Sequence, residues 1–218
     1  IDLTPIDEDT GVENPLEPLL FLNEDKEIRI VTNHFLDIDV PWVKGLHYKL
    51  STGYQRSAGD EKTYKGINTV QGARDNGWLG IQNSKGSAWT IDNILTYKRD
   101  FRKHAVFLTG LYSVQKSVNE NNGMIGRGFQ SDVMTYYQPA NADILTGSAS
   151  YRQRNSTSQM IRANYVYNDR YLITATMRRD GASPFGEDTK FGVFPSLAVG
   201  WNLSNESFMK EVEAIDVL

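Results

Sequence analysis

Side chains that could carry out catalysis or bind a metal ion are scattered through this sequence, and none has the usual spacing. Ser183 lies in a glycine-containing loop, but the Gly-x-Ser-x-Gly spacing that presents a serine nucleophile is missing. The three histidines, His34, His47 and His104, fall in different predicted strands, and the chain has no cysteine. A zinc site needs several such ligands close together. The sequence therefore predicts no catalytic residue, no metal ion and no cofactor, and we expect a protein that is not an enzyme.

Two shorter patterns match ligand-binding motifs only in part. Asp7, Asp9 and Gly11 resemble the start of a calcium loop but lack the rest of its pattern, so an ordinary acidic loop is expected. Residues 126–128 are too short for a dinucleotide fingerprint and lie in a predicted loop. The net charge of -4, without any basic block, argues against nucleic acid as a partner.

The remaining candidates for ligand contact are aromatic or charged. Trp78, Tyr136 and Tyr137 lie in long polar segments rich in Asn, Gln and Gly, where aromatic faces and amide donors suit a sugar or a peptide. Such aromatics also pack against their own loops or against partner proteins. Arg178 and Asp180 share one face of a predicted strand, where they either pair with neighbouring side chains or contact a substrate.

The elements that would position these residues are β-strands with alternating apolar and polar side chains. Residues 46–55 give the clearest case, with Leu46, Tyr48 and Leu50 on one face and His47 and Lys49 on the other. About seven strands are predicted, at residues 28–40, 46–55, 89–99, 104–116, 159–167, 171–180 and 191–202. No apolar run approaches the ~18 residues of a membrane helix. Residues 1–27 are acidic and contain prolines, and a loop segment with a short helix near residues 16–21 is expected there.

The predicted links alternate in length. Links at residues 41–45, 100–103 and 168–170 are short, whereas those at 57–86 and 117–147 are long. Short turns at one end and long loops at the other are typical of an outer-membrane barrel. Alternation alone leaves open a soluble antiparallel β-sandwich that binds carbohydrate, because its strands also have one buried apolar face.

Residues 167–210 add a specific pattern, YNDRYLITATMRRDGASPFGEDTKFGVFPSLAVGWNLSNESFMK. It resembles the barrel signature of the SusC/RagA family of TonB-linked outer-membrane proteins: a Y-x-D/E-R-Y turn, a strand ending in R-R-D-G-S-S-R-F-G, a strand like G-x-F-P-S-x-S-x-G-W, and an E-x-F turn. Ala182 and Pro184 replace the usual Ser and Arg at the loop tip. The matching positions are Tyr167, Asp169, Arg170, Tyr171, Arg178, Arg179, Asp180, Gly181, Ser183, Phe185, Gly186, Gly192, Phe194, Pro195, Ser196, Gly200, Trp201, Glu206 and Phe208.

The resemblance implies an antiparallel transmembrane β-barrel segment in the bacterial outer membrane, with residues 28–218 forming part of the barrel. It implies active import of oligosaccharides or peptides with a SusD-like surface lipoprotein, and energy supplied by the TonB complex through parts of the protein absent from this sequence. Membrane lipid is then a further partner. A structural or adhesive outer-membrane barrel is the other alternative.

The barrel hypothesis makes two structural predictions. The apolar residues of the alternating strands should lie on one side of a single sheet, and burial between two stacked sheets would contradict it; these residues are Leu46, Tyr48, Leu50, Tyr171, Ile173, Met177, Leu197, Val199 and Trp201. Seven strands are too few for a large barrel, so the first and last strands should be open edges, and residues 214–218 resemble the lead-in to a further strand.

Overall fold

A computed structural model describes residues 16–186 and 189–209 of the chain. The calcium-loop candidates Asp7, Asp9 and Gly11 and the expected strand lead-in at residues 214–218 lie outside the described residues. Within those ranges, no helix is long and apolar enough to cross a membrane.

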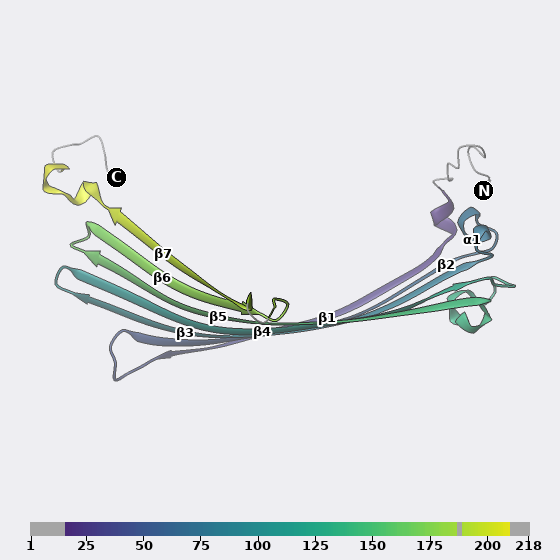
Figure 1. The fold of residues 1–218 in the computed structure, drawn as a ribbon, viewed down its shortest axis with the longest axis horizontal. Helices are drawn as coiled ribbons and strands as arrows, with labels where there is room; N and C mark the ends of the chain where they lie inside the picture. Colours follow the sequence, from purple (N-terminus) through teal and green to yellow (C-terminus); the bar gives the residue numbers. More distant parts are fainter. Residues whose placement is uncertain (1–15, 187–188, 210–218) are drawn as a thin grey trace. The chain divides into compact units, whose positions relative to one another are not determined.

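The described chain is an all-β protein with seven strands in a single sheet (Figure 1), as the alternation predicted. The strands follow one another in chain order across the sheet, and neighbours run antiparallel. Their bounds are β1 (Leu22–Asp39), β2 (Leu46–Lys65), β3 (Trp78–Phe101), β4 (His104–Arg127), β5 (Ile144–Tyr167), β6 (Tyr171–Ala182) and β7 (Phe191–Trp201). The helical pieces are α1 (Val70–Arg74) and the single 3₁₀ turns η1 (Glu17–Leu20), η2 (Thr135–Tyr137), η3 (Pro139–Asn141), η5 (Leu203–Asn205) and η6 (Ser207–Met209).

Most strands are longer than the sequence pattern indicated. The expected links at residues 57–86 and 117–147 were wrong in extent, because β2 to β5 continue through much of them and leave only residues 66–77 and 128–143 as connections. The acidic segment at residues 1–27 is likewise strand from Leu22 onward, after the short helix expected near residues 16–21. The alternation of link length holds, since two to six residues join β1 to β2, β3 to β4 and β5 to β6.

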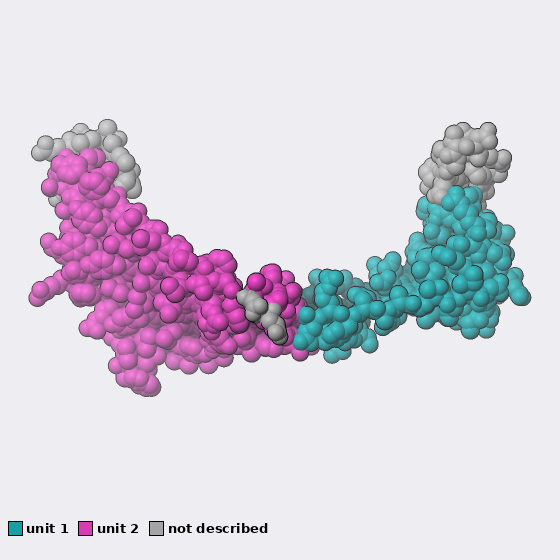
Figure 2. All heavy atoms as spheres, viewed as in Figure 1, with its two compact units in different colours: residues 1–30, 55–87, 118–153 teal, residues 31–54, 88–117, 154–218 magenta. Residues whose placement is uncertain are grey.

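The chain divides into two compact units, each made of parts of several strands (Figure 2). Unit 1 comprises residues 1–30, 55–87 and 118–153, and unit 2 comprises residues 31–54, 88–117 and 154–218. The buried apolar side chains of the described residues, Tyr64, Leu79 and Phe129, all belong to unit 1. In the described part of unit 2 no large apolar side chain is buried, and many are exposed. A soluble sandwich buries one sheet against another, and the described residues form only one sheet, so that alternative is wrong for this segment.

The short turns of unit 2 are tied to one another by backbone hydrogen bonds. The amide of Lys98 donates to the carbonyl of Gly45 at 2.8 Å, and the amide of Asn168 donates to the carbonyl of Lys103 at 2.6 Å. The amide of Asn202 likewise donates to the carbonyl of Arg170 at 2.7 Å. Gly45 has φ of 87°, and an added Cβ there would collide with the carbonyl oxygen of Lys98. A glycine is therefore required where the first turn meets β3.

Candidate functional site

One face of β5, β6 and β7 is a continuous apolar surface within unit 2. Residues directly opposite each other on paired strands share a face, and Ile173 lies opposite Tyr165 on β5 and Val199 on β7. The same register aligns Ile161 with Met177 and Pro195, and Ala163 with Ala175 and Leu197. Leu197 and Val199 are 73% and 77% exposed. Apolar surface of this extent marks contact with lipid or with another protein.

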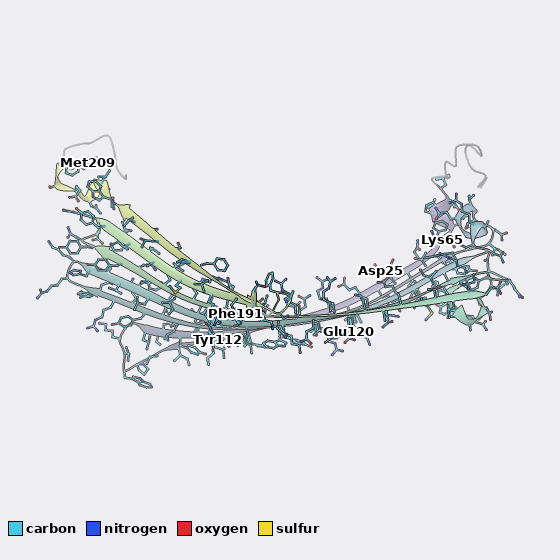
Figure 3. All side chains as sticks on the ribbon, viewed as in Figure 1. Asp25, Lys65, Tyr112, Glu120, Phe191 and Met209 are labelled. Carbon is cyan, nitrogen blue, oxygen red and sulfur yellow. The ribbon has the colours of Figure 1, made fainter. Side chains whose placement is uncertain are left out.

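None of the residues predicted to lie on this face is buried between sheets. Those on β6 and β7 are exposed, and Leu46, Tyr48 and Leu50 on β2 are half-buried. Figure 3 shows side chains on both faces of the strands, with Tyr112 and Phe191 labelled among the aromatics of unit 2.

The opposite face of the same strands is polar and internally paired. Arg178 Nε donates to both oxygens of Asp180 at 2.9 and 2.8 Å, and its Nη2 donates to Ser158 Oγ at 3.3 Å. Thr174 Oγ1, two positions along the same face, donates to Asn164 Oδ1 at 2.8 Å. Arg178 and Asp180 therefore pair with each other and with a neighbour in the wall, which is the simpler of the two roles expected for them. Their contact with a substrate stays a prediction.

A row of aromatic rings, which the alternation of the sequence did not predict, follows the short-turn end of unit 2. Phe101 stacks on His104 with ring centroids 5.0 Å apart, and His104 lies 5.0 Å from Tyr167. Tyr167 stacks on Tyr171 at 6.4 Å, and Tyr171 on Trp201 at 6.3 Å. The available signal was positional, since each ring belongs to a residue at or next to the end of a strand. Rings of this kind are enriched at the boundary between lipid and water.

Glu206 connects this row to the turns. Its carboxylate accepts hydrogen bonds from Tyr171 Oη at 2.9 Å and Trp201 Nε1 at 3.2 Å, and Arg170 lies 3.0 Å away. These donors, Tyr171 first, hold the pKa of Glu206 below its ordinary value. Glu206 is a buried residue in the turn after β7, and it belongs to the E-x-F pattern found in the sequence.

The Glu206 contacts predict a pH dependence. Because the folded state holds the pKa of Glu206 below the unfolded value near 4.5, its stabilising effect is present above that value and is lost as the pH falls below it. In the full-length protein, Glu206→Gln should lower the urea midpoint at about pH 7 and reduce the loss of stability that the unmodified protein suffers near pH 4. The exposed Glu120→Gln is the control, and equal acid sensitivity of all three proteins would contradict the assigned role.

The loop cluster of unit 1 is built around the three buried apolar side chains. Phe129, the second residue of the 128–143 connection, packs edge-on against Tyr64 with ring centroids 5.5 Å apart, and Leu79 is fully buried beside them. Asp132 accepts hydrogen bonds from Tyr64 Oη at 2.8 Å and from the amide of Ile67 at 2.9 Å. The two connections of unit 1 are thus fixed to each other and to the ends of β2 and β3.

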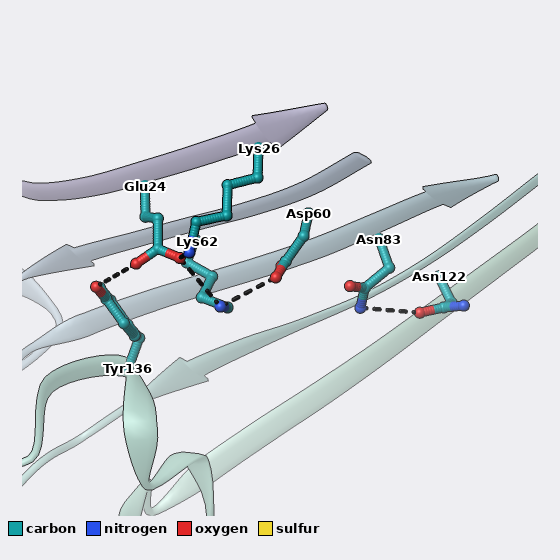
Figure 4. Close-up of polar contacts among 7 residues, drawn as sticks. All are labelled: Glu24, Lys26, Asp60, Lys62, Asn83, Asn122 and Tyr136. Atoms are coloured by element: carbon teal, nitrogen blue, oxygen red, sulfur yellow. Dashed lines mark hydrogen bonds and ion pairs between the residues drawn. The ribbon is translucent and has the colours of Figure 1, made fainter. Parts of the chain in front are cut away.

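Tyr136 belongs to a polar group on the same unit (Figure 4). Its hydroxyl donates to Glu24 Oε2 at 3.0 Å, Lys26 pairs with that carboxylate, and Lys62 lies 3.5 Å from Glu24 and 3.0 Å from Asp60. The hydrogen bond to Glu24 is the main cause that raises the pKa of Tyr136 to about 12. The Tyr136 hydroxyl is therefore engaged within the protein, whereas the ring of Tyr137, 4.7 Å from that of Tyr136, is 71% exposed.

Trp78 lies apart from the tyrosines. It is next to Leu79 on β3, so the two side chains point to opposite faces of the strand, and Tyr136 packs against the Leu79 cluster. Lys65 Nζ lies 5.1 Å from the Trp78 ring, and a Cβ on Gly80 would collide with that ring. Trp78 also lines a cavity of about 270 Å³ with Glu61, Thr63 and Gln82 among others. The structure thus does not bring the three aromatic candidates into one site.

Three of the residues first considered for catalysis or metal binding, His47, His104 and Ser183, have structural partners. His47 lies between Asp37 at 3.2 Å and Asp39 at 3.0 Å, and His104 is 2.6 Å from Tyr165 Oη. Ser183 Oγ accepts from the amide of Asn155 at 2.9 Å, which joins the 183–190 connection to β5. Among residues 16–186 and 189–209, no group of three His, Cys, Asp or Glu side chains could hold a metal ion.

Comparisons with known proteins find relatives over most of the chain. No family model matches the sequence. The TonB-dependent receptor P3 of Formosa agariphila is 30% identical over 175 residues, which is 80% of this chain and 18% of the relative. The TonB-dependent receptor SusC of Bacteroides thetaiotaomicron is 40% identical over 94 residues, which is 43% of this chain and 9% of the relative.

The solved structures give the same fold. The chain in the "Structure of the RagAB peptide transporter" superposes with a TM-score of 0.80 at 17% identity, over 92% of this chain and 22% of that one. These relatives confirm the resemblance to the SusC/RagA family. This chain spans about a fifth of the length of the two TonB-dependent receptors of Formosa agariphila that it matches over most of its residues.

Proposed function

Since the chain resembles a barrel segment of TonB-linked outer-membrane proteins of the SusC/RagA type, we propose that it forms seven wall strands of an outer-membrane nutrient importer. The observation that carries the proposal is the registered, exposed apolar face of β5 to β7 backed by a polar face. A transmembrane barrel has this arrangement, with apolar residues toward lipid and polar residues toward the lumen.

The length of the apolar face supports the same proposal. Phe191 and Trp201 share this face and are ten residues apart on β7. At about 3.3 Å per residue, the strand between them extends roughly 33 Å. A tilt of about 40° reduces this to roughly 25 Å across the membrane, the height of the apolar band between the aromatic girdles of such barrels. The aromatic row at the short turns then marks the periplasmic boundary.

Transport would be the work of the complete receptor. We propose that its substrates are oligosaccharides or peptides, that a SusD-like surface lipoprotein delivers them, and that the TonB complex supplies energy. The support is the SusC name of one relative and the peptide-transporter title of a structural neighbour, each of which describes that other protein. The role is transport rather than catalysis. Within this segment, Tyr137 and Trp78 are the exposed and half-exposed aromatics that we propose as substrate contacts.

Single cysteines test the wall assignment in the complete receptor, because these 218 residues contain none. Val199→Cys and its neighbour Ala198→Cys lie on opposite faces of β7. In outer membranes, Ala198→Cys should react with a water-soluble maleimide, whereas Val199→Cys should react only with a lipid-soluble one. Equal labelling of both positions by the water-soluble reagent would refute the membrane wall. Ile173→Cys and Thr174→Cys on β6 repeat the comparison on the next strand.

A further inference from the structure

A groove interrupts the apolar face of unit 2 at the end of β6 that lies away from the short turns. It has a volume of about 460 Å³ and is lined by Trp89, Thr157, Gly181 and Phe191, among others. By register, Thr157, Gly181 and Phe191 are opposite one another on β5, β6 and β7 and share the apolar face. The groove therefore opens where the proposed function places the upper part of the membrane.

The groove is open because the residues at its base have small side chains. A Cβ added to Gly181 would collide with the ring of Phe191, so this ring lies over the backbone of β6. Beside it, Thr157 has a buried hydroxyl oxygen without a hydrogen-bond partner in the described part of the chain. Buried hydroxyls normally have a partner, and one left without is costly. An aromatic ring on each side and a small-residue floor fit an acyl chain, and the free hydroxyl suits a polar group where that chain begins.

Positive charge surrounds the groove. Lys116 lines it directly. Arg179 belongs to the same face, opposite Val193 and Gln159, and its guanidinium lies 3.9 Å from the centroid of the Phe191 ring. Neither cation forms an ion pair with an acid among the described residues. Lys190 also lines the groove, and two acids, Glu187 and Asp188, precede it in the sequence outside the described residues.

We propose that this groove binds a phosphorylated, acylated lipid of the outer leaflet, namely lipid A. One acyl chain would lie between Trp89 and Phe191, and Lys116 and Arg179 would hold a phosphate. An arginine on an apolar wall is expensive in the hydrocarbon region but favourable at the anionic head groups. Lipid A carries phosphates next to several acyl chains, and here Lys116 and the Arg179 guanidinium lie beside the aromatic wall of the groove. This inference rests on the proposed function, because it needs the apolar face to lie in the outer membrane.

Native mass spectrometry of the complete receptor, titrated with lipid A in detergent, tests the site. The Lys116→Gln/Arg179→Gln double variant should bind lipid A about thirtyfold more weakly. Each of the two cations is expected to contribute about fivefold in affinity for an anionic head group, and the two factors multiply. The matched control is Lys44→Gln/Lys103→Gln, which removes two exposed cations from the short turns and should bind as the unmodified protein does. Thr157→Leu, which fills the groove without changing charge, should also weaken binding.

A second lipid and the control pair decide whether binding is specific to lipid A and to this groove. Phosphatidylglycerol in place of lipid A distinguishes a general preference for anionic lipid, and equal binding of the two would overturn the assignment to lipid A. Equal loss in the control pair would overturn the assignment to this groove. Each variant is first shown to fold by its heat-modifiable mobility on gels. If lipid A binding is unaffected by every variant while the Val199 and Ala198 labelling pattern holds, this inference fails and the proposed function stands.

Discussion

Leu197→Arg is expected to lower the free energy of unfolding of the complete receptor in lipid by about 2–4 kcal/mol. Leu197 lies near the middle of β7, between Phe191 and Trp201, and it is 73% exposed on the apolar face. A guanidinium at that depth must either lose its hydration or distort the surrounding bilayer so that water can hydrate it. The free-energy cost of doing so decreases only near the membrane interfaces. Urea titration of the barrel folded into phospholipid vesicles measures the change.

The control for this substitution is Ala198→Arg on the adjacent residue. Ala198 lies opposite Thr174 on the polar face, where a charged side chain can remain hydrated. We expect a change in stability well below that of Leu197→Arg. If Ala198→Arg were the less stable variant, the orientation of β7 in the wall would have to be reversed, and equal stability of the two would contradict the membrane wall.

Leu79→Ala is expected to weaken the loop cluster of unit 1 by about 2–5 kcal/mol. Leu79 is fully buried, with Tyr64 and Phe129 as its buried neighbours and Gly126 within reach of its side chain. Truncation removes apolar contact and leaves a cavity that the surrounding strands cannot close. The loss should appear as local opening, because the cluster anchors residues 128–143 rather than the whole sheet.

Hydrogen exchange of residues 128–143 in the complete receptor checks this expectation. Faster exchange should be confined to this connection and to the end of β2, while β6 and β7 stay as protected as before. Leu145→Ala provides the matched control, since it is the same substitution at a residue that is 51% exposed. Unchanged exchange in Leu79→Ala would show that the cluster is not what holds the connection.

The sequence predicted strands well where one face is apolar and poorly where both faces are polar. In β2 the alternation from Leu46 to Tyr54 is clear, and the strand was found. Its continuation to Lys65 was assigned to a loop, because Asp60 and Lys62 share a face with Tyr64 and interrupt the apolar pattern. Period-2 hydrophobicity reports burial or lipid contact on one side. A strand whose polar side chains pair across the sheet, as Lys62 and Glu24 do, lacks that signal.

The candidate site was predictable where spacing alone decides geometry. Arg178 and Asp180 are two residues apart on one strand, so their side chains must share a face, and they form an ion pair at 2.8 Å. The separation of Trp78 from Tyr136 was not predictable, because it depends on how residues 128–143 fold back onto Leu79. The contacts of Glu206 needed knowledge of which turn lies beside which, and only the family pattern pointed to that residue.

The hydrogen bonds between the short turns give the sheet a direction of assembly. In each of the three seams, the amide donor lies later in the chain and the carbonyl acceptor belongs to the turn before it, from Gly45 to Lys103 to Arg170. At each of these seams, the turn of one hairpin thus offers a carbonyl to an amide that comes later in the chain. We therefore expect the wall to be extended two strands at a time, because each added hairpin meets a carbonyl that the turn before it already presents.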